Sequence, residues 1–298
     1  MNKKIIFITG ATGKIGKHLI DALDIAKYDV YALCRNEKFN FNSSPKVILG
    51  DLLDVSSYAP VFKNHIDIVV HLGAVTHTND ISEYYKINAA ATSELIKLCK
   101  SNKVNKFIFI STRAISDKGG HYSKSKLMAE TYIKASKLTW VIMRLGEVYG
   151  FSNGQGVDFI LNSIKKMPIV PIIGNGKYGI APVHESDAVS AIIKAIEKDG
   201  IEGKIYNIAG PENFTYNEFI DRILKFYKIR KIKVHIPRIF AWAFLKISSV
   251  IFKKGSFLTM DQLPRLFSEK PYDISEASQD LGFNPSALEN FIINNERI

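Results

Sequence analysis

The chain has 298 residues, of which 46% are hydrophobic and 23% are charged, enough for one large α/β domain or two closely packed lobes. This composition excludes a disordered chain, a collagen-like fibre and a small disulfide-built domain. The net charge of +11 favours an anionic partner, which could be a phosphorylated small molecule, nucleic acid or an anionic membrane surface. The two cysteines, Cys34 and Cys99, are far apart with no histidine cluster beside them, which predicts no metal site and a reducing, cytoplasmic location.

Two apolar stretches bear on membrane insertion. The first, residues 5–8, is shorter than the ~7–15-residue apolar core of an export signal. The second, residues 236–252, is interrupted by a proline and two basic residues, whereas a spanning helix needs about 20 nearly uncharged residues. The sequence therefore predicts neither an export signal nor a transmembrane helix.

In chain order, short apolar runs alternate with helical patterns through the first two-thirds of the sequence. The runs that predict strands are residues 5–9, 30–34, 47–49, 66–72, 107–110 and 140–144. The patterns that predict helices are residues 15–23, 82–101 and 122–135. Apolar runs separated by helices are typical of parallel strands buried on both faces. The predicted fold is therefore α/β, with a doubly wound parallel sheet of the Rossmann type.

The alternation becomes irregular beyond residue 150, and helical patterns dominate from residue 211. We therefore expect residues 1–165 to form a dinucleotide-binding Rossmann domain, to which residues 180–210 return. Residues 166–179 and 211–298 are expected to form a smaller, interlaced, mostly helical substrate lobe over the carboxyl edge of the sheet.

A glycine-rich loop, Gly10-x-x-Gly13-x-x-Gly16, lies between the first predicted strand and the first predicted helix. Glycine allows a tight turn and a close backbone approach to a pyrophosphate, and the helix N-terminus attracts negative charge. A plain strand–helix turn is the alternative, but the position of the loop favours dinucleotide binding.

The end of the second predicted strand bears on the choice of dinucleotide. NAD-binding proteins usually place a carboxylate there for the ribose 2′-hydroxyl, whereas this strand ends in Cys34-Arg35. Arg35, with Lys14 as a second cation, suits the 2′-phosphate of NADP. Glu37 keeps NAD open as the alternative.

Tyr122 and Lys126 are four residues apart at the start of a predicted helix and therefore share one face. A nearby ammonium lowers the pKa of a phenol, which can then exchange a proton with a carbonyl or carbinol oxygen. The strand that ends in Ser111-Thr112 directs hydroxyls to the same edge of the sheet as the glycine loop. One of these hydroxyls can hydrogen-bond the reacting oxygen. A surface helix with a lysine, and a turn rich in Ser and Thr, are the alternatives.

Taken together, these motifs occur in the order seen in the extended short-chain dehydrogenase/reductases, and the chain resembles that family over nearly its whole length. The resemblance is strongest to the branch of sugar-nucleotide epimerases, dehydratases and reductases. It is carried by the glycine loop, Asp51-Leu52, His71-Leu72-Gly73-Ala74, Asn88, Ser111-Thr112, Tyr122-x-x-x-Lys126 and residues 144–150, 182–187, 206–208 and 272–285.

The resemblance implies a role for each matching residue. Thr112 would be the catalytic hydroxyl, Tyr122 the acid/base, and Lys126 both its pKa partner and a ligand of the nicotinamide ribose. The implied substrate contacts are Thr76, Glu147 and Val148. The implied cofactor contacts are Gly10, Thr12, Gly13, Lys14, Ile15, Gly16, Arg35, Asp51, Leu52, Leu72, Gly73, Ala74, Asn88, Ser111, Tyr122 and Lys126.

The sequence departs from this branch at three places. Arg113-Ala114 replaces the acidic pair that follows the catalytic threonine in the dehydratases, which argues against dehydration. Glu147 stands where sugar-nucleotide enzymes often have asparagine, and Ile180 stands where an arginine commonly holds a diphosphate. The nucleotide-sugar assignment therefore stays open on the sequence alone.

A basic stretch, residues 225–233, is followed by the apolar residues 236–252 and by Lys253-Lys254. A buried core helix with solvated flanks is one interpretation. The other is a helix lying in a membrane interface through residues 236–254, with Trp242 and Phe244 among the lipid headgroups. No nucleic-acid recognition motif accompanies the charge, so nucleic acid is not expected as a partner.

The sequence thus predicts an NAD(P)-dependent oxidoreductase or epimerase, with NADP preferred. It would move a hydride between nicotinamide and a secondary alcohol or ketone carbon, namely C4 of a nucleotide sugar, as a 4-keto reductase or 4-epimerase. Two alternatives are a non-catalytic NADP-binding redox sensor and an interfacial reductase of a hydrophobic or lipid-linked ketone. A homodimer is compatible with the sequence.

Overall fold

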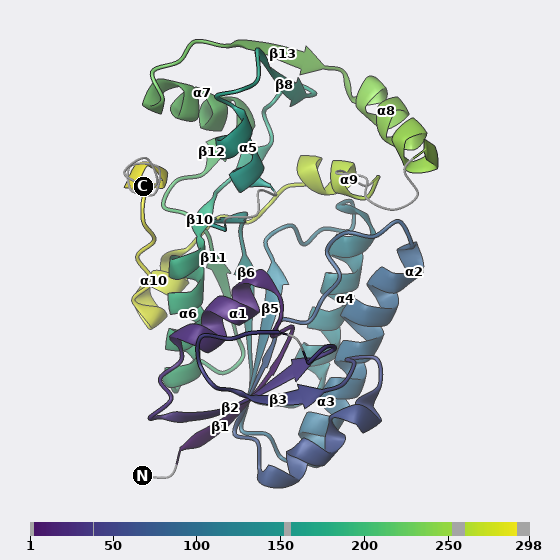
Figure 1. The fold of residues 1–298 in the computed structure, drawn as a ribbon, viewed down its shortest axis with the longest axis vertical. Coiled ribbons are helices and arrows are strands. Elements are labelled where there is room, and N and C mark those ends of the chain that lie inside the picture. Colours follow the sequence, from purple (N-terminus) through teal and green to yellow (C-terminus); the bar gives the residue numbers. More distant parts are fainter. Residues whose placement is uncertain (1–2, 38, 152–155, 252–259, 291–298) are drawn as a thin grey trace.

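The computed structural model describes residues 3–37, 39–151, 156–251 and 260–290, with side chains described up to residue 246 in the third range. A seven-stranded parallel sheet forms the centre of the molecule, with strand order β11-β6-β5-β4-β1-β2-β3 (Figure 1). Its strands are β1 (Lys4–Thr9), β2 (Tyr28–Cys34), β3 (Lys46–Leu49), β4 (Ile68–His71), β5 (Lys106–Thr112), β6 (Trp140–Leu145) and β11 (Lys204–Ile208). This is the doubly wound sheet that the alternating apolar runs predict.

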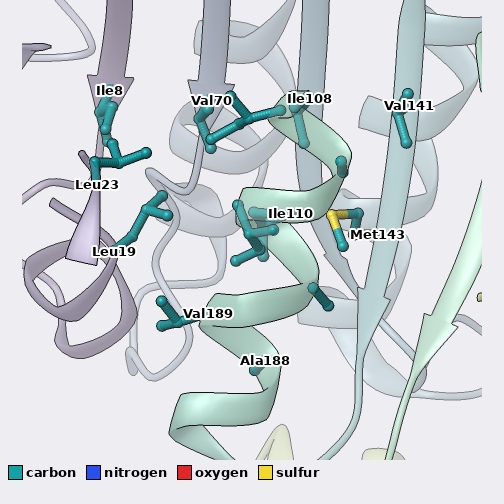
Figure 2. Packing of buried hydrophobic residues seen from close by; sticks show 14 of the residues in the cluster. Ile8, Leu19, Leu23, Val70, Ile108, Ile110, Val141, Met143, Ala188 and Val189 are labelled. Carbon is teal, nitrogen blue, oxygen red and sulfur yellow. The ribbon is translucent and has the colours of Figure 1, made fainter. Parts of the chain in front are cut away.

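Alternate residues along the strands feed two hydrophobic cores, one on each face of the sheet. Ile8, Val70 and Ile108 point to the face covered by α1 (Lys14–Ala22) and α6 (Glu185–Glu197), as Figure 2 shows. Phe7 and Val69 point to the opposite face, which is covered by η2 (Ala59–Asn64), α3 (Ala91–Ser101) and α4 (Gly120–Ala135). Burial on both faces explains why the strands are apolar throughout rather than alternating.

The predicted helix over residues 82–101 is interrupted. The chain forms α2 (Ile81–Glu83), then the π-helix η3 (Tyr84–Ala90), and only then α3. A π-helical turn contains an extra residue, so the side chains on either side of it are rotated relative to a regular helix, and such turns are frequent at functional sites. A hydrophobic periodicity does not distinguish this irregularity from a continuous helix.

The smaller lobe, which the sequence predicts to bind substrate, lies above the carboxyl ends of the central strands (Figure 1). It contains its own hydrophobic core, which includes Tyr149, Leu161 and Phe219. Its elements are α5 (Val157–Ser163), β8 (Ile169–Ile173), β9 (Gly179–Ile180), β12 (Phe214–Thr215), α7 (Tyr216–Phe226), β13 (Ile232–Ile236), α8 (Arg238–Ile251) and α9 (Gln262–Phe267). The short strands form the pairs β13–β8 and β12–β9.

Two segments connect the lobe to the sheet domain. Strands β7 (Val148–Tyr149) and β10 (Val183–His184) pair in parallel just beyond the central sheet. Helix α10 (Ser275–Leu281), in the part of the sequence assigned to the lobe, contributes Ala277 and Leu281 to the core beneath α6. The carboxyl-terminal chain therefore returns to the sheet domain after building the lobe. None of the described helices is long and apolar enough to cross a bilayer.

Candidate active site

The glycine loop joins β1 to α1 and leaves no room for a side chain at Gly10 or Gly16. Gly10 has a φ of +69°, and a Cβ atom on it would lie 2.6 Å from the backbone nitrogen of Gly73. A Cβ atom on Gly16 would lie 2.2 Å from the carbonyl oxygen of Gly10. Helix α1 begins at Lys14, and its N-cap, Gly13, supplies no capping side chain. The loop therefore presents bare backbone and the positive end of a helix, as pyrophosphate binding requires.

The end of β4 lies against this loop. The backbone N–H of Gly73 donates to Thr9 Oγ1 at 3.1 Å, and a Cβ atom on Gly73 would lie 3.0 Å from Leu52 Cδ2. The next turn is held by Asn88 on the π-helix, whose side chain accepts from the N–H of Val75 at 2.8 Å and donates to its carbonyl at 3.0 Å. The π-helix therefore has a structural role, because it places the Asn88 side chain where it hydrogen-bonds both the backbone N–H and the carbonyl of Val75.

The residues expected to contact the adenosine of the cofactor lie just after the carboxyl ends of β2 and β3. Arg35 and Glu37 are both exposed just past β2. The Asp51 carboxylate accepts from the N–H of Leu53 at 2.9 Å, so it shapes its own turn. Lys14 Nζ lies 5.0 Å from the centre of the Phe151 ring. The other predicted cofactor contacts on this rim are partly buried: Thr12, Ile15, Leu72 and Ala74.

This arrangement fits a dinucleotide. The close-packed glycines, the uncapped helix and the apolar rim at Leu52 form a cradle that a single extra Cβ atom would fill. The pyrophosphate would be held by Gly10, Gly13 and Gly16, and the nicotinamide end would face the loop that Asn88 fixes.

Tyr122 lies in the first turn of α4 and is only 8% exposed. Burial raises the pKa of its hydroxyl, while the positive charge of Arg265 and a hydrogen bond with the Thr112 side chain oppose that rise. Thr112 is the last residue of β5, so the phenol meets a hydroxyl at the carboxyl end of the central sheet. The structure therefore brings the predicted pair together at the edge where ligands bind.

Lys126 lies one turn further along α4 and is only 2% exposed. Its Nζ donates to the carbonyl of Ile110 at 2.7 Å and lies 3.9 Å from the centre of the Phe109 ring. Burial lowers the pKa of Lys126 to about 7, although the carboxylate of Glu130 partly opposes this shift. Burial therefore disfavours the charged form of Lys126, whose Nζ is held by the backbone of β5.

Arg265, on α9, was not anticipated from the sequence. Its guanidinium carbon lies 4.5 Å from the centre of the Tyr122 ring, and its Nη1 donates to the carbonyl of Thr76 at 3.4 Å. Asp261, just before α9, accepts from the N–H of Tyr122 at 3.2 Å and caps the start of α4. About 140 residues separate these partners in the sequence, so no local motif could have indicated the contact.

Replacing Arg265 with methionine should make the Tyr122 hydroxyl harder to ionise. Without the guanidinium charge, burial is opposed only by Thr112, so the pKa of Tyr122 rises further. We expect the pH profile of Tyr122 ionisation, followed by ultraviolet difference absorption against a Tyr122→Phe variant, to move to higher pH. Arg265→Lys should restore much of the profile, and an unshifted profile in the methionine variant would contradict this role.

Ser111 points to the other side of β5 from Thr112. Its hydroxyl donates to Glu130 Oε1 at 2.7 Å, and Glu130, which is fully buried, also accepts two hydrogen bonds from Arg144 at 3.0 and 2.6 Å. Adjacent residues of a strand point to opposite faces. The Ser111 side chain is therefore engaged in an ion-pair network between α4 and β6 and does not join Thr112 at Tyr122.

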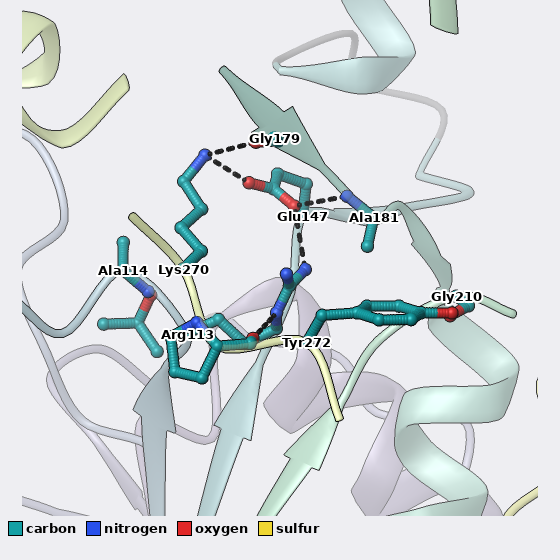
Figure 3. Close-up of polar contacts among 10 residues, drawn as sticks. Arg113, Ala114, Glu147, Gly179, Ala181, Gly210, Lys270 and Tyr272 are labelled. Carbon is teal, nitrogen blue, oxygen red and sulfur yellow. Dashed lines mark hydrogen bonds and ion pairs between the residues drawn. The ribbon is translucent and has the colours of Figure 1, made fainter. Parts of the chain in front are cut away.

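Glu147 lies in a charged cluster between the two lobes (Figure 3). Lys270 donates to its carboxylate at 2.9 Å, and Arg113 Nη1 lies 3.6 Å from the same group. Burial alone would raise the pKa of the Glu147 carboxyl, but Lys270 and Arg113 hold it below its usual range. Arg113 is 1% exposed and donates through Nε to the carbonyl of Pro271 at 2.6 Å.

The cluster explains two departures noted in the sequence. Arg113 replaces an acidic residue, and Glu147 replaces an asparagine; together with Lys270 they connect the ends of β5 and β6 to the carboxyl-terminal chain. The carboxylate of Glu147 is occupied by these two cations. Of the other expected substrate contacts, Val148 starts β7, and Thr76 is exposed beside Arg265.

Comparison with known proteins agrees with this geometry. The sequence model of the NAD dependent epimerase/dehydratase family matches residues 6–209. The chain is 27% identical to a sterol-4-alpha-carboxylate 3-dehydrogenase, decarboxylating, of Dictyostelium discoideum, over 92% of this chain and 93% of that protein. It is 29% identical to a dTDP-D-glucose 4,6-dehydratase of the same organism, over 68% and 57% of the two chains.

Solved structures show the same fold. The UDP-glucuronic acid 4-epimerase of Bacillus cereus, solved with UDP-glucuronic acid and NAD, superposes with a TM-score of 0.74 at 23% identity. The match covers 97% of this chain and 96% of the epimerase. With the family match spanning more than half of the sequence, the interpretation as a non-catalytic sensor loses its support. The chain belongs to the NAD-dependent epimerase/dehydratase family of extended short-chain dehydrogenase/reductases and is an NAD(P)-dependent enzyme.

Proposed function

We propose that this enzyme moves a hydride between nicotinamide and a secondary alcohol or ketone carbon, with Tyr122 as the proton carrier. The observation that supports this most is the placement of the Tyr122 hydroxyl. It is buried, hydrogen-bonded to Thr112, and held at the carboxyl edge of the sheet that also carries the glycine loop. When bound, the dinucleotide supplies or accepts the hydride.

The residues of the chain divide the remaining work. Tyr122 gives a proton to the carbonyl oxygen during reduction and takes one from the alcohol during oxidation. Thr112 steadies the oxygen on which charge develops, because it already hydrogen-bonds the phenol at that point. The charge of Arg265, over the ring, favours the phenolate. Lys126, the partner expected from the sequence, is instead held by the carbonyl of Ile110 and is not among the groups that shift the pKa of Tyr122.

For the substrate we propose a nucleotide sugar that reacts at C4, in a 4-keto reduction or a 4-epimerisation. Several proteins of the same fold are described in complex with nucleotide sugars, among them UDP-glucuronic acid and UDP-glucose. The net charge of +11 favours a substrate that carries phosphates. Arg113-Ala114, in place of an acidic pair, argues against dehydration.

A hydrophobic alcohol or ketone is the second candidate, and specific observations favour it. The carboxylate of Glu147 is paired with Arg113 and Lys270, and position 180, where a diphosphate-binding arginine is common, is a buried isoleucine. In addition, the relative that matches nearly the full length of the chain is a sterol-4-alpha-carboxylate 3-dehydrogenase.

The two candidates are separated by assaying the purified protein directly. For the first, we would follow NADPH absorbance with 4-keto nucleotide sugars, and epimer formation by NMR with UDP-glucose and UDP-glucuronic acid. For the second, we would follow NAD(P)⁺ reduction with a 4-carboxylated 3-hydroxysterol in detergent. Turnover of the sterol alone would overturn the nucleotide-sugar proposal. The mass of any dinucleotide retained through purification adds a further test, since bound NAD favours epimerisation.

We also propose NADP as the preferred cofactor, on the strength of Arg35. It follows directly after β2 and is exposed, so its guanidinium is accessible to a 2′-phosphate. Arg35→Ser should raise the Kd for NADPH about tenfold or more and change that for NADH little, as measured by quenching of tryptophan fluorescence. The matched control is Glu37→Gln. Equal effects of Arg35→Ser on the Kd for NADPH and on the Kd for NADH would contradict this assignment.

A further inference from the structure

The exposed apolar side chains of the described residues are concentrated on the outer side of the substrate lobe. Among the exposed large hydrophobic residues, four of the five that exceed 60% exposure lie between positions 232 and 244. We call the apolar patch the set formed by Ile169, Ile232, Val234, Ile239, Phe240, Trp242 and Phe244. Soluble surfaces rarely gather so many large apolar groups without a partner.

The fold itself turns these side chains outward. Strands β8 and β13 pair in parallel with Ile169 opposite Ile232. The alternate residues Val170 and Ile172 are 4% and 0% exposed, so the inward face of this pair is already packed. Its outward face therefore keeps isoleucines in water. Figure 1 places β13 and α8 at the end of the lobe remote from β1, β2 and β3.

Helix α8 repeats this arrangement. Ala241 and Leu245, four residues apart, are 8% and 4% exposed and pack with Leu263 of α9. Ile239, Phe240 and Phe244 are 72%, 64% and 69% exposed. Over the side chains described up to residue 246, one face of α8 packs on α9, while the other exposes large apolar residues together with Lys246. This pattern is typical of a helix that lies on an interface.

The charge of the sequence segment that carries most of the patch indicates which interface it fits. Residues 222–260 contain ten lysines and arginines and no aspartate or glutamate, whereas the whole chain has a net charge of +11. The cations are Arg222, Lys225, Lys228, Arg230, Lys231, Lys233, Arg238, Lys246, Lys253 and Lys254. Two of these cations are balanced, because Arg222 pairs with Glu212 and Glu289 and Lys233 pairs with Asp221. An apolar helix face within a segment of net positive charge complements a bilayer that contains anionic lipids, which has an apolar interior and a negative surface.

We propose that the apolar patch docks on an anionic membrane surface, with α8 lying in the interface and the basic residues against the lipid headgroups. A second copy of the chain is a poorer fit, because two such segments would bring like charges together. The docked face is one helix away from the chemistry, since α9, on which α8 packs, carries Arg265 over Tyr122. Docking is independent of the proposed reaction and is measured without a substrate.

The test is flotation of the full chain with vesicles of phosphatidylcholine alone and with vesicles of equal parts phosphatidylcholine and phosphatidylglycerol. We expect binding to the anionic vesicles only, weakened by added salt. Phe240→Gln with Phe244→Gln should lower the partition coefficient at least about tenfold, because two exposed rings no longer enter the lipid. The matched control is Ile25→Gln, since Ile25 is 63% exposed on the sheet domain, and it should bind as the wild type does.

The contribution of charge has its own matched pair. Lys225→Gln with Arg230→Gln should weaken binding about tenfold, whereas Lys97→Gln with Lys100→Gln on α3 removes as much charge from another face and should have little effect. Trp242 gives an independent signal in the wild type: its emission should shift to the blue on anionic vesicles, and Trp242→Phe should abolish the shift.

Three results would overturn the proposal. The first is wild-type protein that stays below the anionic vesicles with no change in tryptophan emission. The second is equal loss of binding in the patch variants and their controls. The third is a dimer that the phenylalanine variant converts to a monomer with vesicle binding unchanged, since the patch would then join two copies.

Discussion

Tyr122→Phe is expected to lower turnover at least about a hundredfold while the dinucleotide still binds. The substitution removes one oxygen, the group that exchanges a proton with the reacting oxygen, and the lost contribution of a general acid or base is of this size. The ring itself stays packed against Tyr84 and beneath Arg265, so the fold of the site is preserved. Both kcat and kcat/KM should fall together, because the proton moves only in the transition state.

The measurement compares initial rates and dinucleotide affinity in the wild type and two variants. Tyr85→Phe is the matched control, because Tyr85 lies on the same π-helix as Tyr84 and its hydroxyl shares a hydrogen bond with His121 at 2.9 Å. It should retain most of the wild-type rate. Near-normal turnover in the Tyr122 variant would show that the Tyr122 hydroxyl does not exchange the proton.

Lys126→Met is expected to change how the stability of the dinucleotide-free protein depends on pH. Burial lowers the pKa of Lys126 to about 7 in the folded state, whereas in the unfolded chain the lysine has its usual pKa of 10.5. Below about pH 7 the lysine is charged in both states, and folding bears the full cost of burying that charge. Between pH 7 and 10.5 the folded state binds fewer protons, so the stability of the wild type rises with pH.

The variant lacks this dependence because methionine does not titrate. Its free energy of unfolding minus that of the wild type should therefore be about 2–3 kcal/mol larger at pH 6 than at pH 9, which means that the variant is relatively more stable at the lower pH. The loss of the hydrogen bond to the Ile110 carbonyl lowers stability at both pH values alike, so the difference between them isolates the charge. Urea unfolding at the two pH values measures this difference.

Lys124→Met serves as the control for the lysine variant. Lys124 is on the same helix but is exposed, so its replacement should change stability equally at pH 6 and pH 9. A Lys126 variant with the same pH dependence as the wild type would mean that the ammonium is fully compensated inside the protein. Burying the lysine at a cost in stability fits a group retained for function.

Much of the sheet domain could be predicted because its signals are local. The apolar runs at 5–9 and 107–110 correspond to β1 and β5, and the glycine spacing predicts a turn that the structure forms with Gly10 at positive φ. The placement of Tyr122 and Lys126 one turn apart depends only on helical spacing, and both lie on α4. Each of these features depends only on residues that are close together in the sequence.

The rest of the site depends on contacts between distant segments. Arg265 over Tyr122 and Lys270 beside Glu147 connect residues more than a hundred positions apart, and no periodicity carries that information. A signal did exist for Ser111, because neighbouring residues of a strand point to opposite faces, so the hydroxyls of Ser111 and Thr112 could not be expected to act together. The outward face of α8 also escaped a firm prediction, since an apolar helix can be buried or exposed with the same sequence.

The π-helix at Tyr84–Ala90 makes the site sensitive to the length of the chain as well as to its side chains. Each residue advances a helix by about 100°, so losing one residue ahead of Asn88 would convert the wide turn to a regular one and swing the amide away from Val75. The following helix could keep its buried stripe and the protein could still fold. A deletion as small as one codon would thus dismantle the nicotinamide end of the cradle in an otherwise intact enzyme.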